Sequence, residues 1–89
     1  MTHEQVMITN KLGLHARAAA KLVHTASEFE AEIYIGTEHE EVNAKSILGI
    51  LTLAAAKGTP LNVRADGSDE DAAVRAIVDL FEDKFGEGQ

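Results

Sequence analysis

The sequence predicts an α+β fold, an open-faced β-sandwich in which three helices cover one face of a four-stranded sheet. Four short segments read as strands, three longer segments repeat apolar residues at helical spacing, and their order is β-α-β-β-α-β-α. Three amphipathic helices need one apolar surface to cover, and a four-stranded sheet offers that surface. With 89 residues and a hydrophobic content of 45%, residues 1–89 are expected to form a single domain.

The first half of the chain is predicted to form a strand, a helix and a hairpin. Residues 5–9 read as the first strand, and residues 16–29 read as the first helix. The apolar residues that recur at helical spacing in this helix are Ala19, Ala20, Val23, Ala26 and Phe29. Alternation over residues 31–35 predicts a half-buried second strand, and a polar turn at 36–40 leads into a short third strand at 41–43.

A second helix and a fourth strand follow. Ser46 is placed to cap this helix, and Lys57-Gly58 is a stop signal before Pro60, which prevents continuation. Its core stripe is predicted to consist of Ile47, Ile50, Leu51 and Ala54. The fourth strand is predicted from the alternation of Leu61, Val63 and Ala65.

The last helix is predicted to start after the turn Asp66-Gly67, with Ser68 as its cap. Its first turn holds three acids, Asp69, Glu70 and Asp71, where the helix dipole favours negative charge. Its buried face is expected to be formed by Ala73, Ile77, Leu80 and Phe81.

The charged residues are distributed unevenly. The net charge of −7 argues against nucleic acid as the main partner, because duplex binding usually requires a basic surface. Two acid-free segments, residues 10–27 and 42–65, hold six of the eight cations: Lys11, Arg17, Lys21, Lys45, Lys57 and Arg64. If these segments meet, they form a cationic face that steers an acidic partner or a phosphate donor. The alternative is that acid-free segments arise by chance in a short chain.

Several classes of site and location are disfavoured by composition. The chain has no cysteine, which excludes disulfides and thiolate metal sites and fits a reducing compartment. The spacing of His3, His24 and His39 suits no metal cluster, and no cofactor is expected. We see no signal peptide and no apolar run long enough for membrane insertion, so a cytoplasmic location is expected.

A histidine stands where the first strand gives way to the first helix. In Gly13-Leu14-His15-Ala16-Arg17, His15 is expected at or beside the helix N-cap. The first N–H groups of a helix lack internal partners and carry roughly half a positive charge. A phosphate on His15 would meet the N–H groups of Ala16 and Arg17, and the Arg17 guanidinium would add forked donors. The pattern indicates a phosphate acceptor, and an ordinary capping histidine is the alternative.

Three segments of the chain resemble the HPr family, the histidine-containing phosphocarrier proteins of the bacterial phosphoenolpyruvate:sugar phosphotransferase system. They are Asn-Lys-Leu-Gly-Leu-His-Ala-Arg-Ala-Ala at 10–19, Val-Asn-Ala-Lys-Ser-Ile-Leu-Gly at 42–49 and Ala-Asp-Gly at 65–67. The resemblance covers nearly the whole chain and implies an antiparallel sheet of order 1-4-2-3. The Asn-Lys-Leu-Gly start of the first of these segments and the tail from Phe81 to Gln89 are also similar to the nitrogen-related branch, NPr.

The resemblance implies a phosphoryl carrier and not a turnover enzyme. His15 would accept the phosphoryl group on Nδ1 from enzyme I, Arg17 would contact the phosphate, and an EIIA-type protein would receive the group. Leu48 is expected to stay partly exposed as an apolar docking spot, together with Ile47 and Leu51. Partner contacts are also expected at Lys21 and Lys45. A monomer is expected, because the carrier must visit several partners.

Ser46 matches the serine that HPr kinase/phosphorylase modifies in many family members, although its role as a helix cap alone also accounts for it. An alternative function is therefore a regulatory protein-binding module that acts through its phosphorylation state. A third candidate, a small domain that binds RNA or a metabolite, is disfavoured by the acidic balance and the aromatic content of 4%. The chain departs from the family pattern at Ala18, where proline is common, and at Leu12, where a small polar residue is common.

Overall fold

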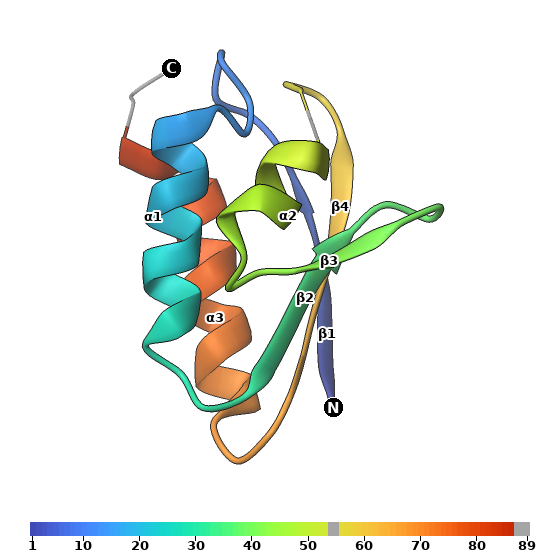
Figure 1. Ribbon diagram of the computed structural model, residues 1–89, viewed down its shortest axis with the longest axis vertical. Helices are drawn as coiled ribbons and strands as arrows, with labels where there is room; N and C mark the ends of the chain where they lie inside the picture. Colours follow the sequence, from blue (N-terminus) through green and yellow to red (C-terminus); the bar gives the residue numbers. More distant parts are fainter. Residues whose placement is uncertain (54–55, 87–89) are drawn as a thin grey trace.

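Three helices cover one face of a four-stranded antiparallel sheet in the part of the chain that the structure describes (Figure 1). The structure is a computed structural model and describes residues 1–53 and 56–86. The strands are β1 (Thr2–Met7), β2 (Glu32–Gly36), β3 (Glu41–Asn43) and β4 (Pro60–Asp66). The helices are α1 (Ala16–Ser27), α2 (Ile47–Leu53) and α3 (Glu70–Glu82), and a 3-10 turn, η1 (Lys84–Gly86), follows. The sheet order β1-β4-β2-β3 confirms the expected topology.

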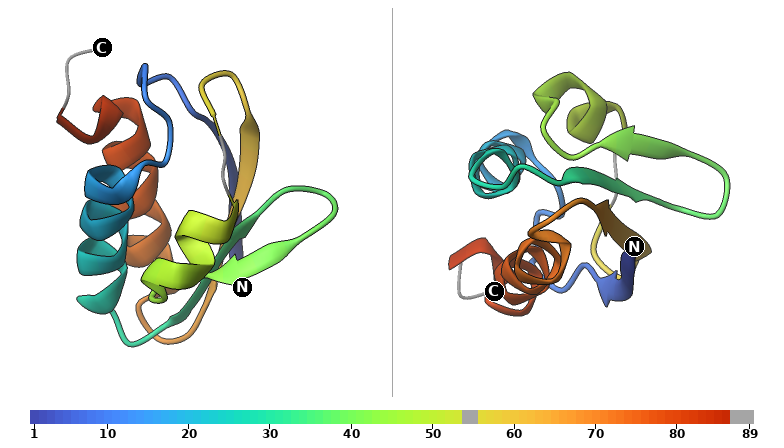
Figure 2. Two further views of the ribbon diagram at one scale, coloured as in Figure 1. Left: turned by 45° about the horizontal axis from the view of Figure 1, so that its top comes forward. Right: turned by 90° about the horizontal axis from the view of Figure 1, so that it is seen from below.

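The register of the sheet directs its apolar residues toward the helices. In β2 and β4, Ile33 pairs with Ala65 and Ile35 pairs with Val63, and all four are fully buried. Because successive side chains of a strand point to opposite faces, Tyr34 and Arg64 lie on the other face, which the helices leave open. The two views of Figure 2 show all three helices on the same side of the sheet. Among the described residues, no helix combines the length and the apolar character needed to cross a bilayer.

The first strand and the first helix differ from their predicted limits. β1 spans Thr2–Met7 where residues 5–9 were expected, and α1 ends at Ser27. The predicted core face of α1 is wrong in part, because Ala20 is exposed and Leu22 is fully buried in its place. Ala19 and Ala26 are buried as predicted, and Val23 and Phe29 are partly buried against the core. Apolar residues occupy so many neighbouring positions of α1 that their spacing alone does not select the buried face.

The start of α3 also corrects a prediction, because Asp69 and not Ser68 is the N-cap residue. Both Asp69 carboxylate oxygens accept backbone hydrogen bonds at 2.9 Å, one from the Glu30 N–H and the other from the Ala31 N–H. The bond from Glu30 is the main cause that holds the pKa of Asp69 below its ordinary value. Asp69 therefore ties α3 to the chain that enters β2, a contact between distant segments that a local capping rule does not anticipate.

The buried face of α3 is close to the predicted one. Ala73, Ile77 and Phe81 are buried as expected, whereas Leu80 is only partly buried and Val74 is buried instead. The Phe81 ring packs edge-to-face against Phe85, with their centroids 4.9 Å apart. The core thus continues past the end of α3 into η1.

The Glu70 carboxylate connects the start of the chain to α3, and this contact predicts that the stability of the fold depends on pH. It accepts hydrogen bonds from the Met1 ammonium at 2.8 Å, the Thr2 hydroxyl at 2.9 Å and the Gly67 N–H at 3.2 Å. The Met1 ammonium is the main cause that lowers the pKa of Glu70 from 4.5 to about 2. Because the pKa is lower in the folded state, this stabilisation is present above pH 4.5 and is lost as the pH falls toward about 2.

Glu70→Gln should therefore lower the stability at neutral pH and make the loss of stability in acid less steep. Urea denaturation of the parent and the variant, repeated from neutral pH down to about 2, measures both effects. Parallel pH profiles for the two proteins would contradict the prediction.

Candidate functional site

His15 stands at the N-terminal end of α1, as the sequence predicts. Its backbone is extended, with φ −74° and ψ 177°, and its carbonyl accepts the Ala19 N–H at 2.8 Å. The His15 side chain does not cap the helix itself, and the residue is half-buried. The ring is therefore held at the helix end without being enclosed in the core.

The loop before His15 is fixed by hydrogen bonds across its own turn. The buried Asn10 donates from Nδ2 to the Gly13 carbonyl at 2.8 Å, and the Gly13 N–H donates to the Asn10 carbonyl at 3.2 Å. Gly13 has a φ of +66°, a conformation that glycine adopts at little cost. His15 thus extends from a loop whose path is already ordered, which lowers the entropic cost of presenting the ring to a partner.

The end of α1 beside His15 is suited to an anion. The first turn holds no acidic residue, and the N–H groups of Ala16 and Arg17 lie where a helix supplies no internal acceptor. The Arg17 side chain is exposed in this turn. Backbone donors, the positive end of the helix dipole and a guanidinium group therefore occur within three residues of chain, an arrangement that favours a phosphate.

Two further polar side chains, Lys21 and His24, follow Arg17 along α1. Arg17, Lys21 and His24 line a shallow hollow of about 480 Å³ with an apolar floor that includes Leu80 of α3. Lys21 also donates from Nζ to the Phe85 carbonyl, so it joins α1 to η1. Arg17, Lys21 and His24 are four and three residues apart and so share one face of the helix, a spacing that was visible in the sequence although no role was assigned to His24.

The other predicted cations do not all join this group. The Arg64 guanidinium binds Glu41 at 2.7 Å and lies 4.3 Å from the centroid of the Tyr34 ring, on the open face of the sheet. The hydrogen bond from Arg64 lowers the pKa of Glu41. Lys45, predicted to contact partners, donates from Nζ to the Phe29 carbonyl at 2.7 Å and so also holds the segment that follows α1. Of the six cations in the two acid-free segments, Arg64 thus does not contribute to a cationic face with Arg17 and Lys21, because a carboxylate on the sheet engages it.

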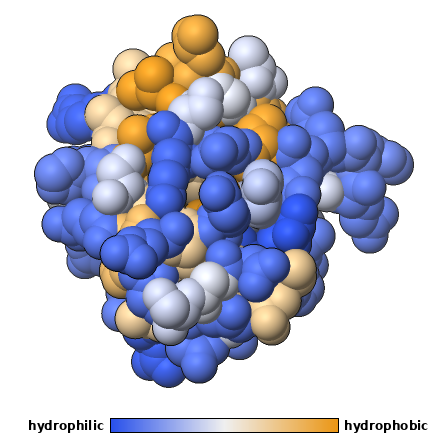
Figure 3. Space-filling view, turned by 60° about the horizontal axis from the view of Figure 1, so that its bottom comes forward, coloured by the Kyte–Doolittle hydropathy of each residue, from blue (hydrophilic) through white to orange (hydrophobic). Residues whose placement is uncertain are grey.

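The second helix presents Ser46 and an apolar patch. The Ser46 Oγ accepts the Gly49 N–H at 3.2 Å, as expected of a capping serine, and the residue is half-buried. Leu48 is 73% exposed, in agreement with its predicted exposure. Ile47 and Leu51 are 42% and 38% exposed, so their predicted place in the core stripe is wrong. Figure 3 shows hydrophobic residues gathered at the top of that view, over α2.

The buried face of α2 is formed by Ile50 and Leu53. Ile50 was predicted and Leu53 was not, while Ala54 lies outside the described residues. Nearly every position of this helix is apolar, so its periodicity has too little contrast to distinguish core from surface. We call Ile47, Leu48 and Leu51 the α2 patch. Leu12, on the loop before His15, is a further large apolar residue with 64% exposure.

Comparisons with known proteins place these residues in a family context. A family model described as "PTS HPr component phosphorylation site" matches residues 2–83. The chain is 52% identical over 87 residues to a phosphocarrier protein HPr of Xylella fastidiosa (strain 9a5c), covering 98% of both chains. It is 49% identical over 83 residues to a phosphocarrier protein NPr of Shewanella violacea, covering 93% of this chain and 91% of the relative.

Solved structures agree with the fold. The crystal structure of HPr-C-His from Thermoanaerobacter tengcongensis shares 47% sequence identity with this chain and has a TM-score of 0.94, covering 98% of both chains. A second structure from that organism, described as an HPr dimer, has a TM-score of 0.79 and covers 98% of this chain and 100% of its own.

Proposed function

The chain belongs to the HPr family of phosphocarrier proteins of the bacterial phosphotransferase system, and on this premise we propose that His15 carries the phosphoryl group. In this proposal His15 accepts the group on Nδ1 from enzyme I and passes it to an EIIA-type protein. The observation that supports it most directly is the position of His15 at the start of α1, two residues before the exposed Arg17. The protein would then be a carrier within a relay and not a turnover catalyst.

The transfer step requires alignment more than chemical catalysis. The Nδ1 lone pair of the neutral His15 ring attacks the phosphorus of the donor phosphohistidine, and a P–N bond forms as the P–N bond to the donor breaks. The donor imidazole takes back the electron pair of the broken bond. Negative charge spreads over the equatorial oxygens, where the first-turn N–H groups and Arg17 stabilise it. In the second transfer His15 is the donor: its P–N bond breaks as the acceptor group of the EIIA protein bonds to phosphorus, and the His15 ring takes back the electron pair.

Two surfaces, one on α2 and one on α1, would receive the partners. The α2 patch offers apolar area, and Arg17 and Lys21 offer positive charge on the neighbouring α1. A partner with an apolar contact surface and an acidic rim fits both, and acidic groups would also speed association. An exposed docking face of this kind suits a monomer, and we place the relay in the cytoplasm.

The direct test is phosphorylation by the proposed donor. Incubation of the chain with phosphoenolpyruvate and catalytic enzyme I should attach one acid-labile phosphate per molecule, which intact-protein mass spectrometry before and after mild acid treatment measures. Absence of phosphate, with an established HPr protein labelled in parallel, would rule the proposal out.

The second candidate function is a regulatory module, which the position of Ser46 favours. A phosphate on Ser46 would add roughly two negative charges at the start of α2, next to the α2 patch. The resemblance implies a kinase/phosphorylase for this step. In this alternative the phosphorylated surface recruits or releases another protein, and phosphoryl transfer through His15 is dispensable.

Ser46→Asp is expected to slow phosphorylation by enzyme I by roughly threefold to tenfold at low enzyme concentration, because a negative charge opposes an acidic partner. Initial rates measured against enzyme I concentration test this. Ser68→Asp, which adds the same charge at an exposed position before α3, is the matched control and should leave the rate unchanged. Equal rates for Ser46→Asp and Ser68→Asp would contradict the prediction. A partner protein that binds only Ser46→Asp, and still does so when His15 is replaced, would favour the regulatory module.

A further inference from the structure

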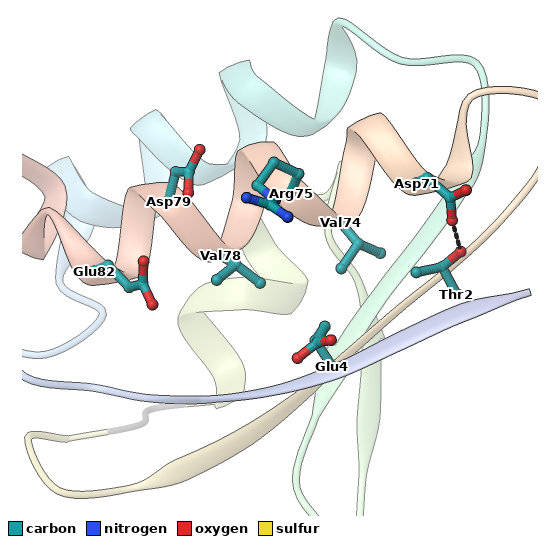
Figure 4. Close-up of a pocket in the computed structure, with 8 residues that line it drawn as sticks. All are labelled: Thr2, Glu4, Asp71, Val74, Arg75, Val78, Asp79 and Glu82. Atoms are coloured by element: carbon teal, nitrogen blue, oxygen red, sulfur yellow. Dashed lines mark hydrogen bonds between the residues drawn. The ribbon is translucent and has the colours of Figure 1, made fainter.

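A groove runs between β1 and α3, away from the residues assigned to phosphoryl transfer. It consists of two adjoining hollows of about 440 and 620 Å³ that share Val78 and Glu82. Figure 4 shows Val74 and Val78 pointing from α3 toward β1, with Glu4 projecting from β1 toward them. In the part of the chain that the structure describes, neither His15, Arg17 nor Ser46 lines this groove.

One wall of the groove is the unpaired edge of a strand. The sheet order places β1 at the end of the sheet, where it pairs with β4 along Thr2–Met7 on one side only. Alternate residues of such an edge strand direct their N–H and C=O groups outward, where another extended chain can bond to them. The six residues of β1 offer an edge of roughly 20 Å, enough to pair with a segment of similar length.

The other wall supplies side-chain contacts of two kinds. Val74, Val78 and Phe81 line the groove from α3 and give it an apolar floor. Charge differs between its ends. The hollow beside Thr2 is lined by one guanidinium, Arg75, and four carboxylates: Glu4, Asp71, Asp79 and Glu82. The charged residues that line the hollow at the other end are two lysines, Lys57 and Lys84, and the shared Glu82.

From this combination we infer that the groove binds an extended peptide segment of another protein, which adds a fifth strand to the sheet next to β1. The segment alternates apolar and polar residues, so that its apolar side chains rest on Val74 and Val78. A lysine or arginine lies at the end beside Thr2, opposite Glu4 and Asp79, and an acidic residue lies near Lys57. This docking site is separate from the phosphoryl-transfer site and leaves His15 accessible to its partners.

The charges disfavour a second copy of this chain as the occupant. Two β1 strands that pair antiparallel about a twofold axis would bring two copies of Glu4 and of the acidic face of α3 toward each other. Like charges at an interface oppose association, and the net charge of −7 adds to the repulsion. A segment of a different protein with a basic end would instead be attracted by the carboxylates of this groove.

The probe for the test is the synthetic peptide acetyl-Glu-Thr-Val-Thr-Val-Thr-Lys-amide, titrated into the full-length ¹⁵N-labelled protein. Amide chemical shifts should change saturably along β1 and α3. With its glutamate near Lys57 and its lysine beside Thr2, the peptide runs antiparallel to β1. The matched control peptide replaces the terminal lysine with glutamate and should bind about tenfold more weakly. A peptide whose alternate backbone nitrogens are methylated, so that it cannot pair with β1, should not bind.

The protein variant that tests the charges is Glu4→Lys with Asp79→Lys, both exposed positions where folding is not at risk. It should reverse the preference and bind the glutamate peptide about tenfold more tightly than the lysine peptide. Phosphorylation of His15 by enzyme I should proceed at an unchanged rate with saturating peptide, which separates this inference from the proposed function. Shifts confined to α1 and α2, no binding at millimolar peptide, or shifts in β1 that depend on protein concentration alone would each overturn the inference.

Discussion

Replacement of His15 by alanine is expected to abolish phosphorylation by enzyme I, with a loss of more than about 10³-fold in the initial rate. In the proposed relay the imidazole supplies the atom that forms the new bond, so a neighbouring group that only stabilises charge cannot replace it. Arg17 and the first-turn N–H groups remain in the variant, but they only neutralise charge on a phosphate that is already attached. Transfer from phosphoenolpyruvate through enzyme I, followed by intact-protein mass spectrometry, measures the loss.

The chain provides its own control for this experiment. His39 is exposed in the turn between β2 and β3, and His39→Ala should be phosphorylated at the parent rate. Urea denaturation of His15→Ala, measured alongside, checks that the variant is folded under the conditions of the assay. Phosphate incorporation that persists in His15→Ala, whether acid-labile or acid-stable, would mean that another residue is the acceptor.

The candidate site was predictable because its parts are contiguous in the chain. His15, Ala16 and Arg17 are neighbours, and a helix start brings their donors together whatever the rest of the fold does. Ser46 was recognised as a cap for the same reason, since its bond to the Gly49 N–H spans only three residues. Local rules suffice where a site is made by one turn of helix.

The order of the strands in the sheet was predictable from local patterns only in part. The element order and the hairpin of β2 and β3 follow from local patterns, but the position of β4 between β1 and β2 does not. That order was expected only from the family resemblance. The pairing of β4 with both β1 and β2 depends on how the helical connections cross the sheet, and short sequence patterns do not predict this.

What the sequence did not reveal depends on contacts between distant segments. The spacing rules could not choose between Ala20 and Leu22 in α1, or between Leu51 and Leu53 in α2, because apolar residues fill neighbouring positions of both helices. Which of these residues is buried depends on the side of each helix that faces the sheet. Asp69 rather than Ser68 likewise occupies the N-cap position of α3, and its carboxylate bonds to N–H groups that precede β2, a contact that no local pattern indicates.

The spacing rules could not decide which helical leucines are buried, and burial determines the largest effect on stability that we expect. Leu22 is fully buried in α1, whereas Leu48 is 73% exposed in α2, although both are leucines in helices. Leu22→Ala should lower the free energy of unfolding by about 2–5 kcal/mol, because it removes buried apolar area and leaves a cavity. Leu48→Ala should change it by less than about 0.5 kcal/mol. Urea denaturation at neutral pH compares the two variants directly.

The same pair of variants also separates stability from docking. Since domains of this size are stable by only about 5–15 kcal/mol, Leu22→Ala should lower the melting temperature by roughly 10 °C or more. At a temperature where it is still folded, it should accept phosphate at the parent rate, because the Leu22 side chain is fully buried and cannot contact a partner. Leu48→Ala should behave in the opposite way, with parent-like melting and a higher KM for enzyme I, because the α2 patch loses its most exposed apolar side chain. If instead Leu48→Ala destabilised the fold as much as Leu22→Ala, the α2 patch would belong to the core and its proposed role in docking would fail.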